Sequence, residues 1–368
     1  MRFSILLPIL LTAALSAHPC SMFTLVRDGA VLFANNEDYI KPGYVWVAPA
    51  GEGRLARLNF GFKDRFAQGG MNERGLAFDA ATVPELPWTA DPARENTDNL
   101  LEHIMNTCAT VAEAEAMFRA YNCKHLSGGQ FMFADATGDS MVVSWLPGTG
   151  LNITRRTGDF QLITNTRIAA SGYRCERYVL AERVLRGDAG DAIGLAAKAL
   201  DTIHQRGPGA YTSYSVIYDL QARRAHVFNL ANFEEMVTLE LPELIAGGKY
   251  DRPLKRLFKN SPRLRDLTGA PPRTYDTRIE LSDDALDRYT GRYSVEKGAA
   301  TVTIRRSGKE LVLEAPGGNP AHLFPEGFGR FRIREGGQMT FLAKGEGPVR
   351  GFTLHRNGDH PGVRLAED

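Results

Sequence analysis

The chain has 368 residues, of which 43% are hydrophobic, and its 44 lysines and arginines nearly balance 43 aspartates and glutamates. This length allows two domains, and the hydrophobic content is enough for a large core in each. A formal net charge of +1 gives no reason to expect nucleic acid or an anionic membrane surface as a partner. The composition agrees with a globular protein.

The first 19 residues have the pattern of a secretory signal peptide. Arg2 supplies the positive end, an apolar segment covers residues 3–15, and mostly small residues occupy 14–17. The apolar segment is too short for a membrane-spanning helix, so we expect no integral membrane segment. Removal of residues 1–19 would leave Cys20 as the first residue of a periplasmic or secreted protein. The alternative is a buried N-terminal helix.

A β-hairpin over residues 20–34 is predicted directly after this leader. Its two apolar runs flank an Asp-Gly dipeptide at 28–29, which is the strongest short-range hairpin signal because both positions need φ > 0. The hairpin returns the chain beside its own start. It therefore brings Asn36 and Asp38 close to Cys20.

An N-terminal cysteine is a compact catalytic unit. Its thiol has a pKa of about 8.5 and the adjoining α-amine one of about 7.7–8.0, so the amine can take the thiol proton without a histidine. Cys20 is therefore a candidate nucleophile. A buried or disulfide-bonded cysteine that merely follows the leader is the alternative, and this stretch alone leaves both open.

Three further motifs follow in order along the chain. An Asn-x-Asp element occupies residues 36–38, the run MNERGL occupies 71–76, and a Thr-Asn pair follows an apolar run at 164–165. Together with Cys20 they resemble the cysteine branch of the N-terminal nucleophile (Ntn) hydrolases. These linear amide C–N hydrolases include penicillin V acylase, choloylglycine hydrolase and the acyltransferase of penicillin biosynthesis. The resemblance covers roughly residues 20–240.

The resemblance implies an α+β fold, a four-layer αββα Ntn-hydrolase sandwich, and an amidase that works through a thioester. In that mechanism Asp38 would hold the amine and thiol of Cys20 in register. The side chain of Asn165 and a backbone N–H near Thr82 would stabilise the oxyanion. Asn36 is expected to brace the hairpin. We expect a small-molecule amide as substrate and no metal or cofactor, and the oligomeric state stays open.

Two arginines of the resembling family are absent from their expected places. Asn35 and Val216 stand there instead, so we expect Arg167 or Arg174 to supply positive charge near the thiolate. Thr82 stands where bile salt hydrolases tend to have asparagine. This difference argues against bile salts as the substrate.

In chain order, residues 39–70 are rich in aromatic side chains, which with Met22 and Trp88 are candidates for an apolar acyl pocket or for plain core. The patterns then predict a strand, two helices opening near Thr97 or Asp98 and at Thr110, four strands, two more helices and two strands. The predicted ranges of the later elements are strands 130–134, 140–145, 151–154 and 160–164, helices 173–186 and 190–205, and strands 211–218 and 225–229.

Residues 242–280 contain five prolines and many basic residues, and they read as a linker after a catalytic domain of residues 20–241. From 281 to 368, short strands alternate with glycine turns, which predicts a small all-β barrel or sandwich. This part resembles the β domain often appended to serine β-lactamase-like proteins and amidases. Because it holds no catalytic constellation, we expect a chain ending near Pro262 to keep amidase activity.

Other interpretations remain for the chemistry of the cysteines. Cys20 after an apolar leader could be lipidated, which would make the protein an exported lipoprotein or binding protein, although residues 17–19 lack the expected lipidation pattern. An acyltransferase could use the same thioester. Cys108, Cys123 and Cys175 could include one disulfide or be three separate buried thiols.

Overall fold

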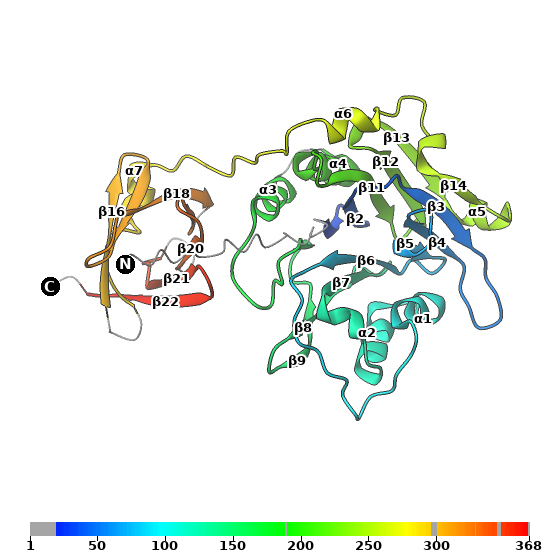
Figure 1. The fold of residues 1–368 in the computed structure, drawn as a ribbon, viewed down its shortest axis with the longest axis horizontal. Coiled ribbons are helices and arrows are strands. Elements are labelled where there is room, and N and C mark those ends of the chain that lie inside the picture. Colours follow the sequence, from blue (N-terminus) through cyan, green and yellow to red (C-terminus); the bar gives the residue numbers. More distant parts are fainter. Residues whose placement is uncertain (1–19, 188–189, 296–299, 328, 344–346, 367–368) are drawn as a thin grey trace, which may run out of the picture.

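The computed structural model describes residues 20–187, 190–295, 300–327, 329–343 and 347–366 (Figure 1). The predicted signal peptide, residues 1–19, lies outside them. The described chain forms two β-sheets with flanking helices, followed by a closed β-barrel. The predicted α+β class and the small all-β C-terminal unit are thereby confirmed.

Six antiparallel strands form the sheet that carries Cys20, in the order β10-β1-β2-β11-β12-β13. Asp28 and Gly29 turn β1 into β2 with φ of 51° and 80°, which confirms the predicted hairpin. The strands are β1 (Ser21–Arg27), β2 (Ala30–Tyr39), β10 (Phe160–Ile163), β11 (Tyr211–Asp219), β12 (Arg224–Asn229) and β13 (Asn232–Glu240).

The second sheet has the order β14-β3-β4-β5-β6-β7-β8-β9. Its strands are β3 (Tyr44–Ala48), β4 (Arg57–Gly61), β5 (Ala67–Asn72), β6 (Ala77–Thr82), β7 (Gly129–Ala134), β8 (Ser140–Leu146), β9 (Gly150–Arg155) and β14 (Asp251–Pro253). β14 comes from the expected linker, yet it pairs with β3, and Leu254 after it is fully buried in the core between the sheets. The first part of residues 242–280 therefore belongs to the sandwich, because its apolar side chains cover the sheet.

Helices pack on the outer faces of both sheets (Figure 1). α3 (Glu176–Leu185) and α4 (Ala192–Ile203) cover the first sheet, while α1 (Leu100–Thr107), α2 (Val111–Ala120) and η1 (Lys124–Ser127) cover the second. α2 begins after Thr110 as predicted, and the side chains of Thr110 and Glu113 form a reciprocal capping box there. α1 is capped by Asn99, where the sequence predicted Thr97 or Asp98.

Strand β2 presents its two faces to different layers. Phe33 lies in the core between the sheets, whereas Leu32 and Ala34 lie in the core under α3 and α4. Because strand side chains alternate, Glu37 faces the other sheet and Asp38 faces the helices. The neighbouring strand β11 changes face by a bulge at the same height.

That bulge lies between Thr212, which pairs with Asp38, and Tyr214, which pairs with Glu37. Residues two positions apart in a regular strand, as Thr212 and Tyr214 are in the sequence, would point to the same face of the sheet. The extra residue, Ser213, lets Thr212 point toward the helices while Tyr214 joins the core between the sheets. The bulge thus gives each of the two carboxyl groups a different hydroxyl neighbour.

The connection to the barrel contains α5 (Leu241–Ala246), η2 (Leu254–Arg256) and α6 (Leu264–Thr268). The barrel begins after α7 (Asp283–Asp287), and aromatic side chains such as Tyr293 and Phe331 fill its interior. Its strands close in sequence order and are β15 (Gly291–Val295), β16 (Ala300–Ser307), β17 (Glu310–Glu314), β18 (Ala321–Gly327), β19 (Arg330–Ile333), β20 (Gln338–Leu342), β21 (Gly351–His355) and β22 (Asp359–Arg364).

Candidate active site

Cys20 lies directly before β1, with 4% of its surface exposed. Its side chain belongs to the core between the sheets and borders a cavity of about 220 Å³. Lys41, Asp64 and Thr82 are exposed and form the rim of this cavity. The complete lining is Cys20, Glu37, Tyr39, Lys41, Phe62, Asp64, Gln68, Ala80 and Thr82.

Asp38 is fully buried on the helix-facing side of β2, and its carboxylate has three partners. Thr212 Oγ1 donates to Oδ1 at 2.5 Å, Gln205 Nε2 donates to Oδ2 at 2.9 Å, and Arg177 Nη1 lies 3.7 Å from Oδ2. Burial raises the pKa of Asp38 to about 6, and Arg177 and the two hydrogen bonds oppose that rise. The carboxylate is therefore held in place and mostly ionised at neutral pH.

Arg177, on the first turn of α3, connects the groups expected to act in catalysis. Its Nη1 donates to the carbonyl of Cys20 at 3.1 Å and to Ser21 Oγ at 2.5 Å. Its Nη2 donates to Asn165 Oδ1 at 2.8 Å, and Asn165 Nδ2 donates to the carbonyl of Thr82 at 2.7 Å. One guanidinium thus orients the nucleophilic residue and the expected oxyanion group together.

The two arginines expected near the thiolate lie elsewhere. Arg167 is buried and its Nη2 donates to the carbonyls of Leu126 and Ser127, at 3.3 Å and 2.5 Å. Arg174 Nη1 donates to the carbonyls of Ser171 and Tyr173, both at 2.9 Å. Neither guanidinium is seen at Cys20, because both are held by main-chain oxygens of their own surroundings.

Arg177, which does reach Cys20, was not predicted from the sequence, although the sequence contains a signal for it. Arg177, Ala181 and Leu185 follow one another at intervals of four along α3, and all three are buried. Residues four apart share one face of a helix. An arginine on the buried face of an amphipathic helix needs a polar partner, and that requirement marks it as a candidate.

Three other expected residues occupy different places. Asn36 Nδ2 donates to the carbonyl of Leu200 on α4 at 2.9 Å, and Asn36 accepts from Ser215 Oγ at 2.6 Å, so it ties the hairpin to its neighbours. Met22 is fully buried between the sheets. Trp88 packs against Trp145, with ring centroids 6.1 Å apart, and lies outside the lining of the cavity at Cys20.

The face of β2 toward the second sheet carries a second acidic group. Glu37 accepts a hydrogen bond from the Cys20 thiol, and burial followed by the nearby Asp79 raises the pKa of Glu37 well above its usual range. Asp79 comes from β6, and burial raises the pKa of its carboxyl as well. Asp79 fits there because Gly69 faces it: a Cβ on Gly69 would lie 2.9 Å from Asp79 Cγ.

The Cys20 thiol is protonated at neutral pH in these surroundings. Burial raises its pKa well above the ordinary value, Glu37, Asp38 and Asp79 raise it further, and a backbone hydrogen bond from Asp38 opposes them. Because the thiolate is the nucleophilic form, the thiol needs a base beside it. The α-amine of Cys20 itself would be such a base after removal of residues 1–19.

The barrel contacts the segment that carries Arg177. Ser171 Oγ donates to Asp359 at 2.8 Å, and the backbone N–H of Arg174 donates to Gln338 at 2.9 Å. Arg330 of the barrel pairs with Glu182 of α3 at 2.7 Å. A chain ending near Pro262 would lose these contacts, and its activity stays a prediction.

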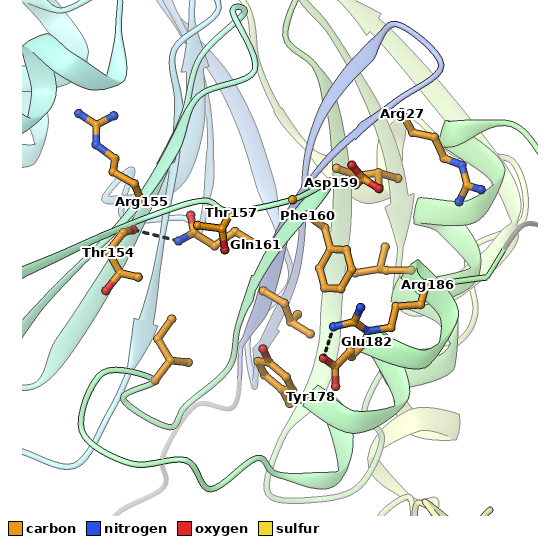
Figure 2. Close-up of a pocket in the computed structure, with 15 residues that line it drawn as sticks. Arg27, Thr154, Arg155, Thr157, Asp159, Phe160, Gln161, Tyr178, Glu182 and Arg186 are labelled. Carbon is orange, nitrogen blue, oxygen red and sulfur yellow. Dashed lines mark hydrogen bonds and ion pairs between the residues drawn. The ribbon is translucent and has the colours of Figure 1, made fainter. Parts of the chain in front are cut away.

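A larger cavity, of about 600 Å³, lies at the other end of β1 (Figure 2). Leu25 and Arg27 border it, and a strand rise of about 3.3 Å per residue places Leu25 roughly 16 Å along the chain from Cys20. Figure 2 shows Arg186 paired with Glu182 and Gln161 bonded to the carbonyl of Thr154, so these polar groups of the lining already bond to other protein groups. We therefore place the candidate active site at the smaller cavity.

Within the described residues, no group of three or more histidine, cysteine or acidic side chains has a geometry that could hold a metal ion. The four cysteines are all unpaired thiols, and Cys175 is only half-buried. None of the helices in the described part is long and apolar enough to cross a membrane.

The fold and this geometry define a class: a two-sheet sandwich with outer helices and a buried cysteine at the start of its first strand. No family model matches the chain, and no curated protein does. Two variants of conjugated bile acid hydrolase from Clostridium perfringens are similar in structure, each with 16% identity and a TM-score of 0.50. The match covers 63% of this chain and 95% and 96% of theirs.

A penicillin V acylase from Agrobacterium tumefaciens is similar with a TM-score of 0.48 and 16% identity, over 63% of this chain and 90% of that one. At such identity a likeness shows the fold. The resemblance drawn from the motifs is confirmed at that level, since the matched 63% of this chain is similar in fold to the bile acid hydrolase.

Proposed function

We propose that this protein is an Ntn hydrolase of linear, non-peptide amides, with Cys20 as nucleophile and the α-amine of Cys20 as base. The observation that carries the proposal is the position of Arg177, which bonds the Cys20 carbonyl and Asn165 and lies beside Asp38. The layer order of helices, two sheets and helices, and the likeness to the bile acid hydrolase, support it. We assign the sandwich to the four-layer αββα Ntn type.

Maturation is part of the proposal. The leader, residues 1–19, directs the chain to the periplasm or the exterior and is then removed. Pro19 disfavours direct cleavage by a signal peptidase, so cleavage after Ala17 would leave His18 and Pro19 for removal by the Cys20 thiol. The new α-amine then lies beside the thiol, where Asp38 accepts its hydrogen bonds.

Acylation begins with transfer of the thiol proton to the α-amine. The thiolate attacks the amide carbonyl, and the oxyanion is stabilised by Asn165 and by a backbone N–H near Thr82. Arg177 fixes the orientation of Asn165 by bonding its Oδ1. The C–N bond breaks, the α-ammonium returns its proton to the departing amine, and the acyl group remains on Sγ as a thioester.

Deacylation repeats these steps with water as the nucleophile. The α-amine takes a proton from water, the hydroxide attacks the thioester carbonyl, and the same groups hold the oxyanion. The C–S bond breaks and the thiol regains its proton. An acyltransferase would differ only in using an amine in place of water.

The buried thiol favours the amidase over the lipoprotein. Only 4% of Cys20 is exposed, and its side chain packs between two sheets. A lipid chain attached to Sγ would have to leave through the fold, at a large cost in packing. A small acyl group on Sγ has the adjoining cavity of about 220 Å³.

The test is to express the protein with its own leader and analyse the exported form. We expect an intact mass that begins at an unmodified Cys20, and amine release from at least one amide in a panel of linear amides. Cys20→Ala should lower turnover to below about a thousandth, as for the loss of a nucleophile. Cys123→Ala, which changes a buried thiol in another core, is the matched control and should stay active. A lipidated Cys20, or an active Cys20→Ala protein, would contradict the proposal.

A further inference from the structure

Two carboxyl groups meet between the sheets beside the nucleophile, without a cation. Glu37 and Asp79 are 3% and 1% exposed, and the charge of each raises the pKa of the Cys20 thiol. Among the residues that the structure describes, no ion pair joins either carboxyl to an arginine, lysine or histidine. Glu37 Oε2 and Asp79 Oδ2 also lack any hydrogen-bond partner there.

Such an arrangement is costly unless something else satisfies it. A buried carboxylate needs a paired charge or donors, and two adjacent carboxyls otherwise hold protons at neutral pH. The raised pKa values of Glu37 and Asp79 reflect this cost. Asp38, one residue away, bears less of this cost because Arg177 is its neighbour, although burial still raises its pKa to about 6.

Other polar atoms around the pair lack partners as well. Asn35 Oδ1, an acceptor, is buried without a partner among the described residues, and so are the Tyr214 and Tyr218 hydroxyls, which can donate or accept. Asp79 Oδ1 does have a donor, the backbone N–H of Ala80. The charges of Glu37 and Asp79 act on both tyrosines, which places the four side chains in one neighbourhood. A group with several donors and a positive charge would satisfy this neighbourhood, and a primary ammonium has three donors and no acceptor.

The cavity offers a route for such a group to Glu37. Glu37 lines it together with the Cys20 thiol, and the rings of Tyr39 and Phe62, 4.6 Å apart, form one wall. About 220 Å³ corresponds to roughly seven water volumes, at about 30 Å³ each. That space is large enough for a short chain beside Glu37.

We propose that the acyl group of the substrate is short and carries a primary ammonium on its α or β carbon, which binds to Glu37 with Asp79 behind it. The inference rests on the proposed amidase function and names its substrate class: amides of small amino acids. Glu37 bonds the thiol, so a group that binds Glu37 lies within a few bonds of the carbonyl that Sγ attacks. The acyl group stays on Sγ, and the contact therefore persists in the thioester.

The experiment compares isosteric acyl groups on one leaving amine. The β-alanyl and butyryl 4-nitroanilides differ only in an ammonium or a methyl group, and the glycyl and propionyl pair shortens the chain by one carbon. For the matured wild-type protein we expect kcat/KM to favour the ammonium member of at least one pair by about tenfold to a hundredfold. This is the range for a hydrogen bond to a charged group.

Glu37→Gln tests the assigned residue, because it keeps the shape and removes the charge. The ratio of kcat/KM between the ammonium and neutral members should fall at least about tenfold. Glu234→Gln makes the same change at an exposed position on β13 and should leave the ratio as in wild type. Asp79→Asn is the second variant, and its ratio should fall in the same direction if Glu37→Gln does not fold.

The outcomes separate the two proposals. Intact-mass detection of the acylated enzyme and release of 4-nitroaniline report whether any amide reacts at Cys20. If neutral amides react as well as or better than their ammonium partners, the substrate class is wrong while the amidase stands. If Glu37→Gln slows both members equally, Glu37 acts on the thiol and the inference is overturned. If no amide of either charge acylates Cys20, the amidase proposal fails, and the inference fails with it.

Discussion

Adjacent residues of β2 place two carboxyl groups on opposite faces of one sheet, and their surroundings differ. On the helix-facing side, Asp38 has a guanidinium and two hydrogen-bond donors. On the side between the sheets, Glu37 faces Asp79, and no cation of the described residues pairs with either. Asp38 thus has its partners within the protein, whereas the proposal above assigns the cation that Glu37 and Asp79 lack to the substrate. The predictions below test this difference.

The largest effect should come from removing the cation of the helix-facing side. Arg177→Met leaves the buried Asp38 unpaired, and breaking a buried pair in this way costs about 3–5 kcal/mol of unfolding free energy. Glu37→Gln replaces a carboxyl that has no paired cation and whose pKa is raised, so we expect at most about 1 kcal/mol of loss, or a gain. Denaturant unfolding of the two variants measures the contrast.

Arg177→Lys is the control for this contrast. It keeps the positive charge but lacks the two guanidinium nitrogens that bond the Cys20 carbonyl and Asn165 at the same time. Its stability should lie between wild type and Arg177→Met. Equal losses for Arg177→Met and Glu37→Gln would remove the distinction between the two sides.

The next effect concerns the oxyanion group that Arg177 orients. Asn165→Ala should fold normally yet lose about 2.7–4 kcal/mol of transition-state stabilisation, which is about 10²–10³ in turnover. Steady-state kinetics on any amide that the wild type hydrolyses provides the measurement. Because Asn165 belongs to the helix-facing network, the ratio between ammonium and neutral acyl groups should not change. Turnover within about a factor of two of wild type would take Asn165 out of the mechanism.

The pH dependence of stability should be of similar size and can be assigned to one carboxyl. The pKa of Asp38 is about 6 in the folded protein and about 3.9 when unfolded. The folded state holds the proton more tightly, so this stabilisation is complete below about pH 4 and is lost as the pH rises through about 6. The change corresponds to about 3 kcal/mol.

Denaturant unfolding between pH 4 and 7 tests this assignment. Asp38→Asn should flatten the fall in unfolding free energy over that interval. Glu37 and Asp79 have raised pKa values too, so a fall that they cause should persist in Asp38→Asn. A wild-type curve and an Asp38→Asn curve with the same slope would show that Asp38 is not the group that titrates.

The smallest effect should come from the barrel, because the contacts described above join it to the helix-facing side of the site. The double variant Gln338→Ala and Asp359→Ala removes the bonds to Arg174 and Ser171 at the start of the segment that carries Arg177. We expect kcat to fall about threefold to tenfold, since each bond is worth about 0.5–1.5 kcal/mol. Arg305→Ala, which breaks a pair within the barrel, is the control. An unchanged kcat would leave the barrel without a role at the site.

Local features of the chain were predictable because their causes are local. The Asp28-Gly29 turn follows from two positions that need positive φ, and the capping box at Thr110 follows from two side chains three residues apart. The glycine turns after residue 281 likewise predicted short antiparallel strands, which the barrel contains. The hairpin alone also brings Asp38 next to Cys20, so part of the candidate site follows from the order of residues.

The sequence by itself thus determined the hairpin, the helices, the mixed fold with its all-β end, and the candidate residues Cys20, Asp38 and Asn165. Only the tertiary structure decided which arginine bonds to these residues. Arg177 and Cys20 are 157 positions apart in the sequence, and no local pattern encodes a contact at that separation. The tertiary structure also decided that Glu37 meets Asp79, since that depends on how two sheets stack. The bulge at Ser213 sets the faces of Thr212 and Tyr214 for the same reason: one extra residue matters only against a neighbouring strand.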